Sequence, residues 1–102
     1  MRPDRDAVAV AEILEASRLI AQFVEGMDRE AFLLDYKTQS AVVLQILLIG
    51  EAARGLSEQF RRRSASIPWS EIVRMRDKLI HHYSARDLHE IWKTAVEDIP
   101  AH

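Results

Sequence analysis

The sequence predicts an all-α fold, an up-and-down helical bundle of four main helices and one additional short helix. Its 102 residues suffice for one domain, residues 1–102, with a single hydrophobic core. Hydrophobic residues make up 48% and charged residues 29% of the chain, a balance that is typical of folded proteins. Only three glycines and three prolines occur, and so few breakers favour long helices over many short strands and turns.

The N-terminal half carries two long stretches of helical spacing. Apolar residues repeat at this spacing over residues 3–24, and Gly26 follows as a helix stop. Asp28 is a good N-cap, so a short helix is expected over residues 28–33. A second main helix is expected from residue 35 to about residue 62.

The central part of this second helix lacks a polar face. Residues 41–49 are apolar on nearly every side, apart from Gln45, and a small domain cannot bury all sides of a helix within one chain. A second copy of the chain is the simplest cover, so we expect a homodimer. The alternative is a central helix wrapped by its neighbours. The run is far too short to span a bilayer, and no membrane partner is expected.

Two further helices are expected in the C-terminal half. Pro68 suits a first helical turn, and the third main helix is expected over residues 69–83. Asp87 and Glu90 have the spacing of a capping box, in which each side chain bonds a free backbone N–H at the start of a helix. The fourth main helix is expected over residues 88–99.

Charge is distributed unevenly along the chain. Residues 61–86 hold seven Lys or Arg and two acids, a net charge of +5, although the whole chain carries −2. A basic segment of this kind can meet phosphate or an acidic partner. Equally, the arginines at 61–63 can simply complement the C-terminus of a helix.

The absence of cysteine narrows the chemistry. It excludes a disulfide framework, a thiolate metal site and a cysteine nucleophile. It also fits a reducing compartment, and the cytoplasm is the expected location.

The residues best suited to chemistry lie near the end of the third helix. Arg76 can hold a phosphate through its planar, permanently charged fork, and His81 can give or take a proton near neutral pH. Together they are the minimum for cleaving a phosphodiester without a cofactor or a metal ion. Asp77 and His81 could offer two metal ligands, but the paired Glu-x-x-His motif of helical metal sites does not occur, so no metal is expected.

Helix geometry restrains this interpretation. Five residues turn a helix by about 140°, so Arg76 and His81 do not share a face, whereas Asp77 and His81 do. Three arrangements could still join them: a distorted helix end, an Arg76 side chain that wraps around the helix, or a second chain that completes the site. The competing explanation is that these charges only complement the helix dipole.

Several neighbours are candidates for supporting roles. Glu51 lies in a mostly apolar run, and a buried acid needs partners; it either orients Arg76 or forms a structural salt bridge. Arg74 and Lys78 are candidates for contacts with RNA.

The segment from Arg76 to Tyr83 resembles the signature of the HEPN superfamily, in particular its HepT-like branch, long catalogued as domain-of-unknown-function family 86. The signature is Arg, a polar residue, three variable residues and His, with Tyr two places later in this branch; Arg76, Asp77, His81 and Tyr83 fit it. Members most often have Asn where Asp77 stands. The runs Ile49-Gly50-Glu51-Ala52-Ala53 and Ile67-Pro68-Trp69 are also similar, so the resemblance covers nearly the whole chain.

The resemblance implies a helical homodimer whose shared cleft holds both copies of the motif. It implies a toxin that is a metal-independent ribonuclease, paired with a nucleotidyltransferase antitoxin of the MNT type. In these terms Arg76 binds phosphate and stabilises charge, His81 is the acid or base, Asp77 and Glu51 orient them, and Tyr83 accepts AMP from the antitoxin. The alternative function is a non-catalytic module that binds the nucleotidyltransferase and presents Tyr83 to it.

Overall fold

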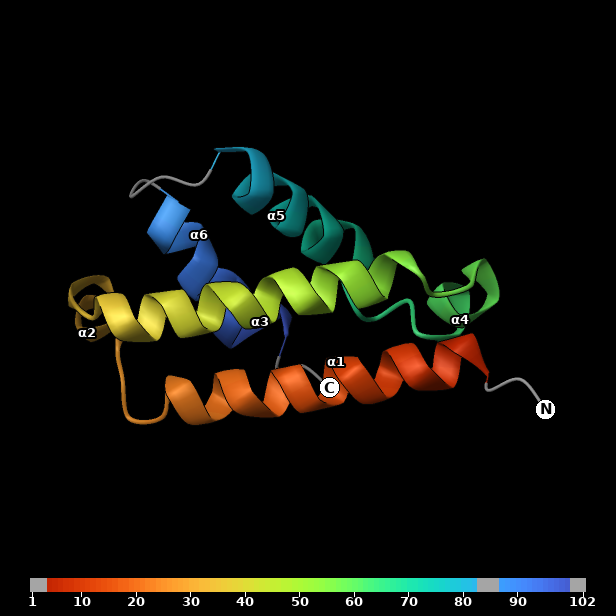
Figure 1. The fold of residues 1–102 in the computed structure, drawn as a ribbon, viewed down its shortest axis with the longest axis horizontal. Helices are drawn as coiled ribbons and strands as arrows, with labels where there is room; N and C mark the ends of the chain where they lie inside the picture. The colour runs from red at the N-terminus through yellow and green to blue at the C-terminus, as the bar shows by residue number, and fades with distance from the viewer. Residues whose placement is uncertain (1–3, 83–86, 100–102) are drawn as a thin grey trace.

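The computed structural model of the protein describes residues 4–82 and 87–99. Within these ranges the chain forms six α-helices and one π-helix and contains no strand, so the all-α prediction is confirmed. The helices α1 and α3 lie side by side along the long axis, with α5 and α6 on the other side of α3 (Figure 1). None of the described helices combines the length and the apolar character that a membrane span requires.

The first two helices begin and end close to the predicted positions. Helix α1 spans Arg5–Phe23 and helix α2 spans Arg29–Leu34. The carboxylate of Asp28 accepts a hydrogen bond of 2.8 Å from the backbone N–H of Ala31, which confirms its role as the N-cap of α2. Between the helices Gly26 has φ +76°, a conformation that residues with a Cβ atom rarely adopt.

The prediction of one helix over residues 35–62 was wrong, because the chain breaks it into two. Helix α3, Tyr36–Arg54, ends at Gly55, and helix α4, Glu58–Arg63, begins after the N-cap Ser57. A distant contact holds the break in place: the backbone N–H and the hydroxyl of Ser57 donate hydrogen bonds of 2.8 and 2.6 Å to the carboxylate of Asp6 on α1.

The C-terminal half contains helix α5, Trp69–His82, and helix α6, Leu88–Lys93. The π-helix η2, Thr94–Asp98, continues α6 where a regular helix was expected. The capping-box prediction was wrong as well, because the side chain of Asp87 makes no capping hydrogen bond at the start of α6. Its carboxylate lies 3.3 Å from Nζ of Lys78 on α5 instead.

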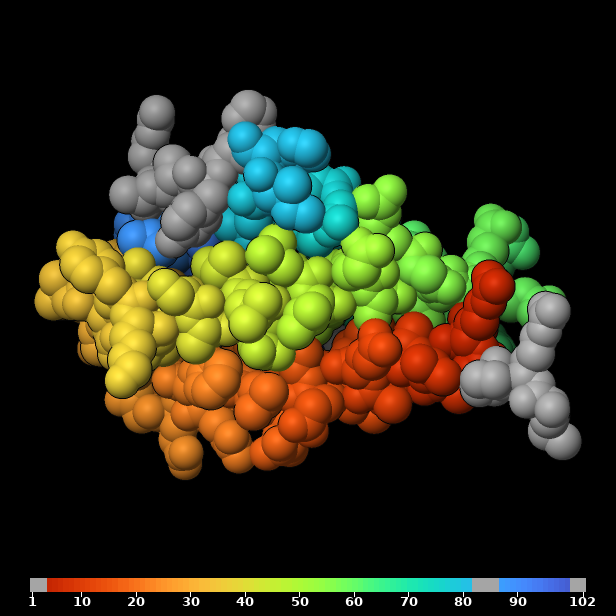
Figure 2. Space-filling model, viewed as in Figure 1, coloured from red at the N-terminus to blue at the C-terminus, as the bar shows by residue number. Residues whose placement is uncertain are grey.

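The hydrophobic core lies around α3, the central helix. Its fully buried large side chains come from α1, α2, α3 and α6, and are Ile20, Phe32, Val42, Ile46, Ile49 and Ile91. Helix α3 is therefore wrapped by its neighbours, as the alternative interpretation expected. Its burial is nevertheless incomplete: α3 forms a continuous band of surface between α1 and α5 (Figure 2), and Leu44 and Leu48 remain 54% and 49% exposed.

Candidate active site

The candidate site is built where α5 packs tightly against α3. Gly50 of α3 lies against Arg76 of α5, and a Cβ atom added to Gly50 would lie only 2.3 Å from Cβ of Arg76. Only glycine permits this approach. The sequence offered a signal for this role, an isolated glycine within a helical pattern, but gave no indication that its partner would be Arg76.

Two carboxylates fix the guanidinium of Arg76. Its Nη1 donates a hydrogen bond of 2.8 Å to Oδ1 of Asp77, and its Nη2 donates one of 2.7 Å to Oε2 of Glu51. The side chain of Arg76 is only 18% exposed, so its position is well defined. Such charge-assisted hydrogen bonds are among the stronger ones in proteins.

The contact between Glu51 and Arg76 is thus present, as the sequence suggested. However, the expectation of a buried acid was wrong, because the side chain of Glu51 is 66% exposed. Glu51 belongs to the outward-facing stripe of α3, and it reaches Arg76 over Gly50, its neighbour in the chain. That it orients Arg76 for function stays a prediction.

Asp77 lies at the centre of the charged groups. Besides the bond from Arg76, its Oδ1 lies 3.7 Å from Nη1 of Arg54, the last residue of α3. The hydrogen bond from Arg76, together with the positive charges of Arg54, Arg76 and His81, lowers the pKa of Asp77 below its usual value. Asp77 is therefore a carboxylate at neutral pH and links two arginines on different helices.

His81 lies one helical turn beyond Asp77 on the same side of α5, within electrostatic reach of that carboxylate. Its side chain is exposed and makes no hydrogen bond to another described residue. Helix α5 is α-helical from Trp69 through His82, so a distorted helix end does not bring Arg76 and His81 together. The two carboxylates that bind Arg76 also keep its guanidinium beside α3 and Asp77.

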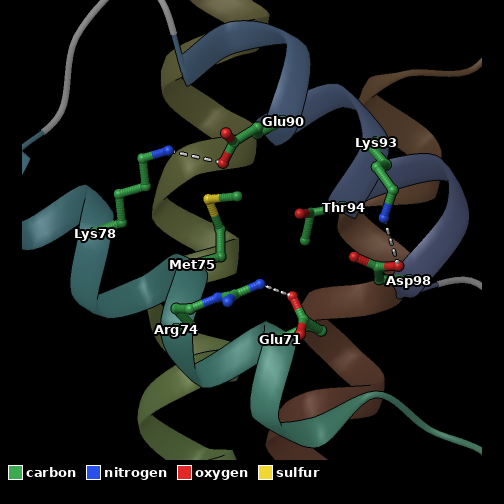
Figure 3. A pocket seen from close by; sticks show the side chains of 8 residues that line it. All are labelled: Glu71, Arg74, Met75, Lys78, Glu90, Lys93, Thr94 and Asp98. Carbon is green, nitrogen blue, oxygen red and sulfur yellow. Dashed lines mark hydrogen bonds and ion pairs between the residues drawn. The ribbon is translucent and has the colours of Figure 1, made fainter.

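Arg74 and Lys78 face a different part of the surface. Each lies two positions from Arg76, a turn of about 200° around the helix. They line a pocket of about 460 Å³ between α5 and the pair α6 and η2 (Figure 3). One chain alone therefore does not place these two bases beside Arg76 and His81, and their contact with RNA stays a prediction.

Acidic side chains neutralise the bases of this pocket. Nζ of Lys78 lies 2.8 Å from Oε2 of Glu90 and 3.3 Å from Oδ1 of Asp87, and Arg74 pairs with Glu71. The hydrogen bonds from Lys78 to Glu90 and to Asp87 raise the pKa of the lysine. The pocket is thus lined by balanced ion pairs rather than by free positive charge.

Among residues 4–82 and 87–99, no group of three His, Asp or Glu side chains gathers in a way that could hold a metal ion. Tyr83, the expected site of modification, lies outside the described residues.

Comparison with known proteins gives a consistent result. The model of the family described as "Ribonuclease HepT-like" matches residues 13–102. A protein of Thermococcus cleftensis named "Probable ribonuclease HepT" is 47% identical over 90 residues, which cover 88% of this chain and 82% of that protein. Two further relatives, which are provisionally named as RNases, are each 38% identical. The one from Methanocaldococcus jannaschii aligns over 96% of this chain and 82% of its own length, and the one from Caldanaerobacter subterraneus subsp. tengcongensis over 86% and 79%. No solved structure matches the chain.

Proposed function

Because the chain belongs to the ribonuclease HepT-like family, we propose that it is an endoribonuclease that uses Arg76 and His81 as its catalytic residues. The observation that carries this proposal is the placement of Arg76. Its guanidinium is held at the surface of α3 by Glu51 and Asp77, and an exposed imidazole follows one turn beyond Asp77. This pairs a fixed cation with an imidazole, a side chain that can act as an acid or a base in catalysis.

These groups suit transesterification of an RNA phosphodiester. A neutral His81 takes the proton of a ribose 2′-hydroxyl, and the oxygen attacks the adjacent phosphorus. The bond from phosphorus to the 5′-oxygen breaks, and a protonated imidazole supplies the proton that this oxygen needs. Arg76 stabilises the extra negative charge on the phosphate in the transition state. The products are a 2′,3′-cyclic phosphate and a 5′-hydroxyl end, and no metal ion takes part.

One imidazole cannot act as base and acid on opposite sides of the phosphorus at the same time. A homodimer with a shared cleft would supply a second His81. The surface beside the site supports this arrangement, because Leu44 and Leu48 lie on the same stripe of α3 as Glu51, and Ile80 lies one turn beyond Arg76. Ile80 is 48% exposed. Together these three apolar side chains offer a surface that a second copy would cover.

Cleavage of a single-stranded RNA in the presence of EDTA tests the nuclease. The wild-type protein should cleave, and both His81→Ala and Arg76→Ala should lose activity by a factor of at least about 100. His89→Ala and Arg18→Gln are matched controls, since both residues are exposed and lie on other helices, α6 and α1. Equal cleavage by all five proteins, or cleavage that EDTA abolishes, contradicts the proposal.

A charge within the apolar surface tests the dimer. Leu48→Glu should dissociate the dimer in analytical ultracentrifugation and should lose RNA cleavage at the same protein concentrations. Leu14→Glu on α1 is the control, because Leu14 is similarly exposed but lies on another helix. A wild-type protein that cleaves RNA as a monomer excludes the shared cleft.

We further propose that the nuclease is a toxin whose partner is an MNT-type nucleotidyltransferase. Tyr83 follows His81 by two residues, and AMP transferred from ATP to its hydroxyl, with release of pyrophosphate, would place a bulky anion near the catalytic groups. Mass spectrometry of the protein co-expressed with a nucleotidyltransferase encoded by an adjacent gene should detect AMP, and Tyr83→Phe should not carry it. If expression of the wild type and of His81→Ala impairs growth equally, the protein acts on cells without catalysis, as a binding module would.

A further inference from the structure

The charge balance of the candidate site requires one more cation. Arg76 contributes one positive charge, and the carboxylates that bind it, Glu51 and Asp77, contribute two negative charges. These three residues therefore carry a net charge of −1. An RNA phosphodiester is also an anion, so this group alone would repel its substrate. A base nearby must offset this negative charge.

Arg54 is the base in the right place. It lies at the C-terminus of α3, and its Nη1 is 3.7 Å from Oδ1 of Asp77, the oxygen that accepts the hydrogen bond from Arg76. This separation is that of an ion pair but is too long for a hydrogen bond. The guanidinium of Arg54 donates no hydrogen bond to any described residue, so its N–H groups are available to a ligand.

Two arginines of α4 already have hydrogen-bond partners. Arg61 of α4 donates a hydrogen bond of 2.6 Å to the backbone carbonyl of Ala53, and Arg62 donates to Glu58. Arg54 could serve only to complement the negative end of α3, but a lysine would do that equally well. A planar fork beside a second, fixed guanidinium matches the oxygens of a phosphate group more specifically.

We propose that Arg54 is a phosphate-binding residue of the RNA cleft and that it contacts the backbone beside the phosphate held by Arg76. A phosphate oxygen takes the place of Asp77 as the partner of Arg54, while Asp77 keeps its hydrogen bond to Arg76. Before RNA binds, Asp77 lies next to both guanidinium groups and holds them at the same edge of the cleft, so it is a positioning residue. This inference rests on the proposed nuclease function and assigns a further residue to the same site.

Binding of a single-stranded RNA oligonucleotide, measured in the His81→Ala background to prevent cleavage, tests the inference. Arg54→Gln should weaken binding by about tenfold, which is typical of the loss of a hydrogen-bonded charge. The slope of log K against log salt concentration should become shallower by about 0.7, because one phosphate contact is lost from a single strand. Arg54→Lys should keep the slope and lose part of the affinity.

Arg18→Gln is the matched control in the same background. The side chains of Arg18 and Arg54 are 54% and 53% exposed, and each pairs with one carboxylate, but Arg18 lies on α1, on the other side of α3 (Figure 1). Arg18→Gln should change neither affinity nor slope. Thermal unfolding of each variant shows whether the fold is intact.

The outcomes separate this inference from the proposed function. If Arg54→Gln binds RNA like Arg18→Gln, the role of Arg54 is wrong and the nuclease proposal is unaffected. If Arg54→Gln weakens binding as expected but the wild type does not cleave RNA, the binding site stands and the nuclease proposal is wrong. If the folded His81→Ala protein binds no RNA at all, the role of Arg54 is wrong, whereas cleavage by the wild type decides the nuclease proposal.

Discussion

A single methyl group at position 50 should disturb both the fold and the site. A Cβ atom at Gly50 would lie 2.3 Å from Cβ and 2.6 Å from Cγ of Arg76. Rotation of the arginine side chain cannot relieve the first contact, because Cβ is attached directly to the backbone of α5. The substitution Gly50→Ala must therefore move α5 away from α3.

The size of the effect follows from two opposing terms. Carbon atoms pack at about 3.5–4.0 Å, so this contact must open by more than about 1 Å. Overpacking of this kind costs about 1–3 kcal/mol. Alanine gains about 0.5–1 kcal/mol over glycine within a helix. The free energy of unfolding should fall by about 1 kcal/mol, the difference between the middle values of these two ranges.

Urea unfolding followed by circular dichroism measures this change, and the m-value should stay the same. Gly55→Ala is the control, because a Cβ atom at Gly55 would meet only the carbonyl oxygen of Ala52, at an ordinary 3.5 Å. Gly55→Ala should leave stability unchanged or slightly increased. Gly50→Ala should also reduce RNA cleavage in fully folded protein, since it displaces Arg76 from Glu51.

A double-mutant cycle provides the refuting result. Arg76→Gly removes the Cβ atom that causes the clash, so Gly50→Ala should cost little in that background. If the cost of Gly50→Ala persists undiminished beside Arg76→Gly, the contact with Arg76 is not its cause. Equal losses in Gly50→Ala and Gly55→Ala would lead to the same conclusion.

Three further predictions concern the rest of the fold. Hydrogen bonds from Ser57 lower the pKa of Asp6. Because the Asp6 carboxylate is protonated more readily in the unfolded chain than in the folded one, this contact should stabilise the protein above about pH 4, and the stabilisation should be lost as the pH falls through the lowered pKa. Asp6→Asn should therefore flatten the dependence of the free energy of unfolding on pH over this range. Phe32 is fully buried, with its ring centre 5.3 Å from that of Trp92, and Phe32→Ala should lower the free energy of unfolding in urea by about 3–5 kcal/mol. Gln39 is buried and donates hydrogen bonds of 2.9 and 3.0 Å to two carbonyls of α2, so Gln39→Leu should cost about 1–3 kcal/mol in the same assay.

The sequence predicted those elements of the fold that local interactions determine. The N-cap at Asp28 and the helix stop at Gly26 involve only neighbouring residues, and both were identified. The break after Arg54 was missed although Gly55 and the N-cap Ser57 are local signals for it. Periodicity continues through Leu56 and Phe60, whereas the contact that fixes the break joins residues 51 positions apart.

The same distinction applies to the candidate site. Arg76 and His81 were singled out as candidates because their chemistry is visible in the residue types, and their catalytic roles stay predictions. Glu51 was suggested as a partner because an acid in an apolar run needs one. Arg54 was not singled out, because it lay within the helix predicted over residues 35–62 and far in the sequence from Arg76 and His81. Only its distance of 3.7 Å from Asp77 indicates a second role.

The geometry of α3 explains why stability and the site are coupled in this protein. One side of the helix, including Ile46 and Ile49, forms the core, and Gly50 lets α5 pack closely enough for Glu51 to reach Arg76. The exposed stripe that carries Glu51 also carries Leu44 and Leu48. Charged residues at those two positions would make the monomer more soluble at little cost to its core, yet they would remove the surface that the shared cleft needs. If the nuclease works as a dimer, the apolar surface of α3 is part of its site rather than a defect of its packing.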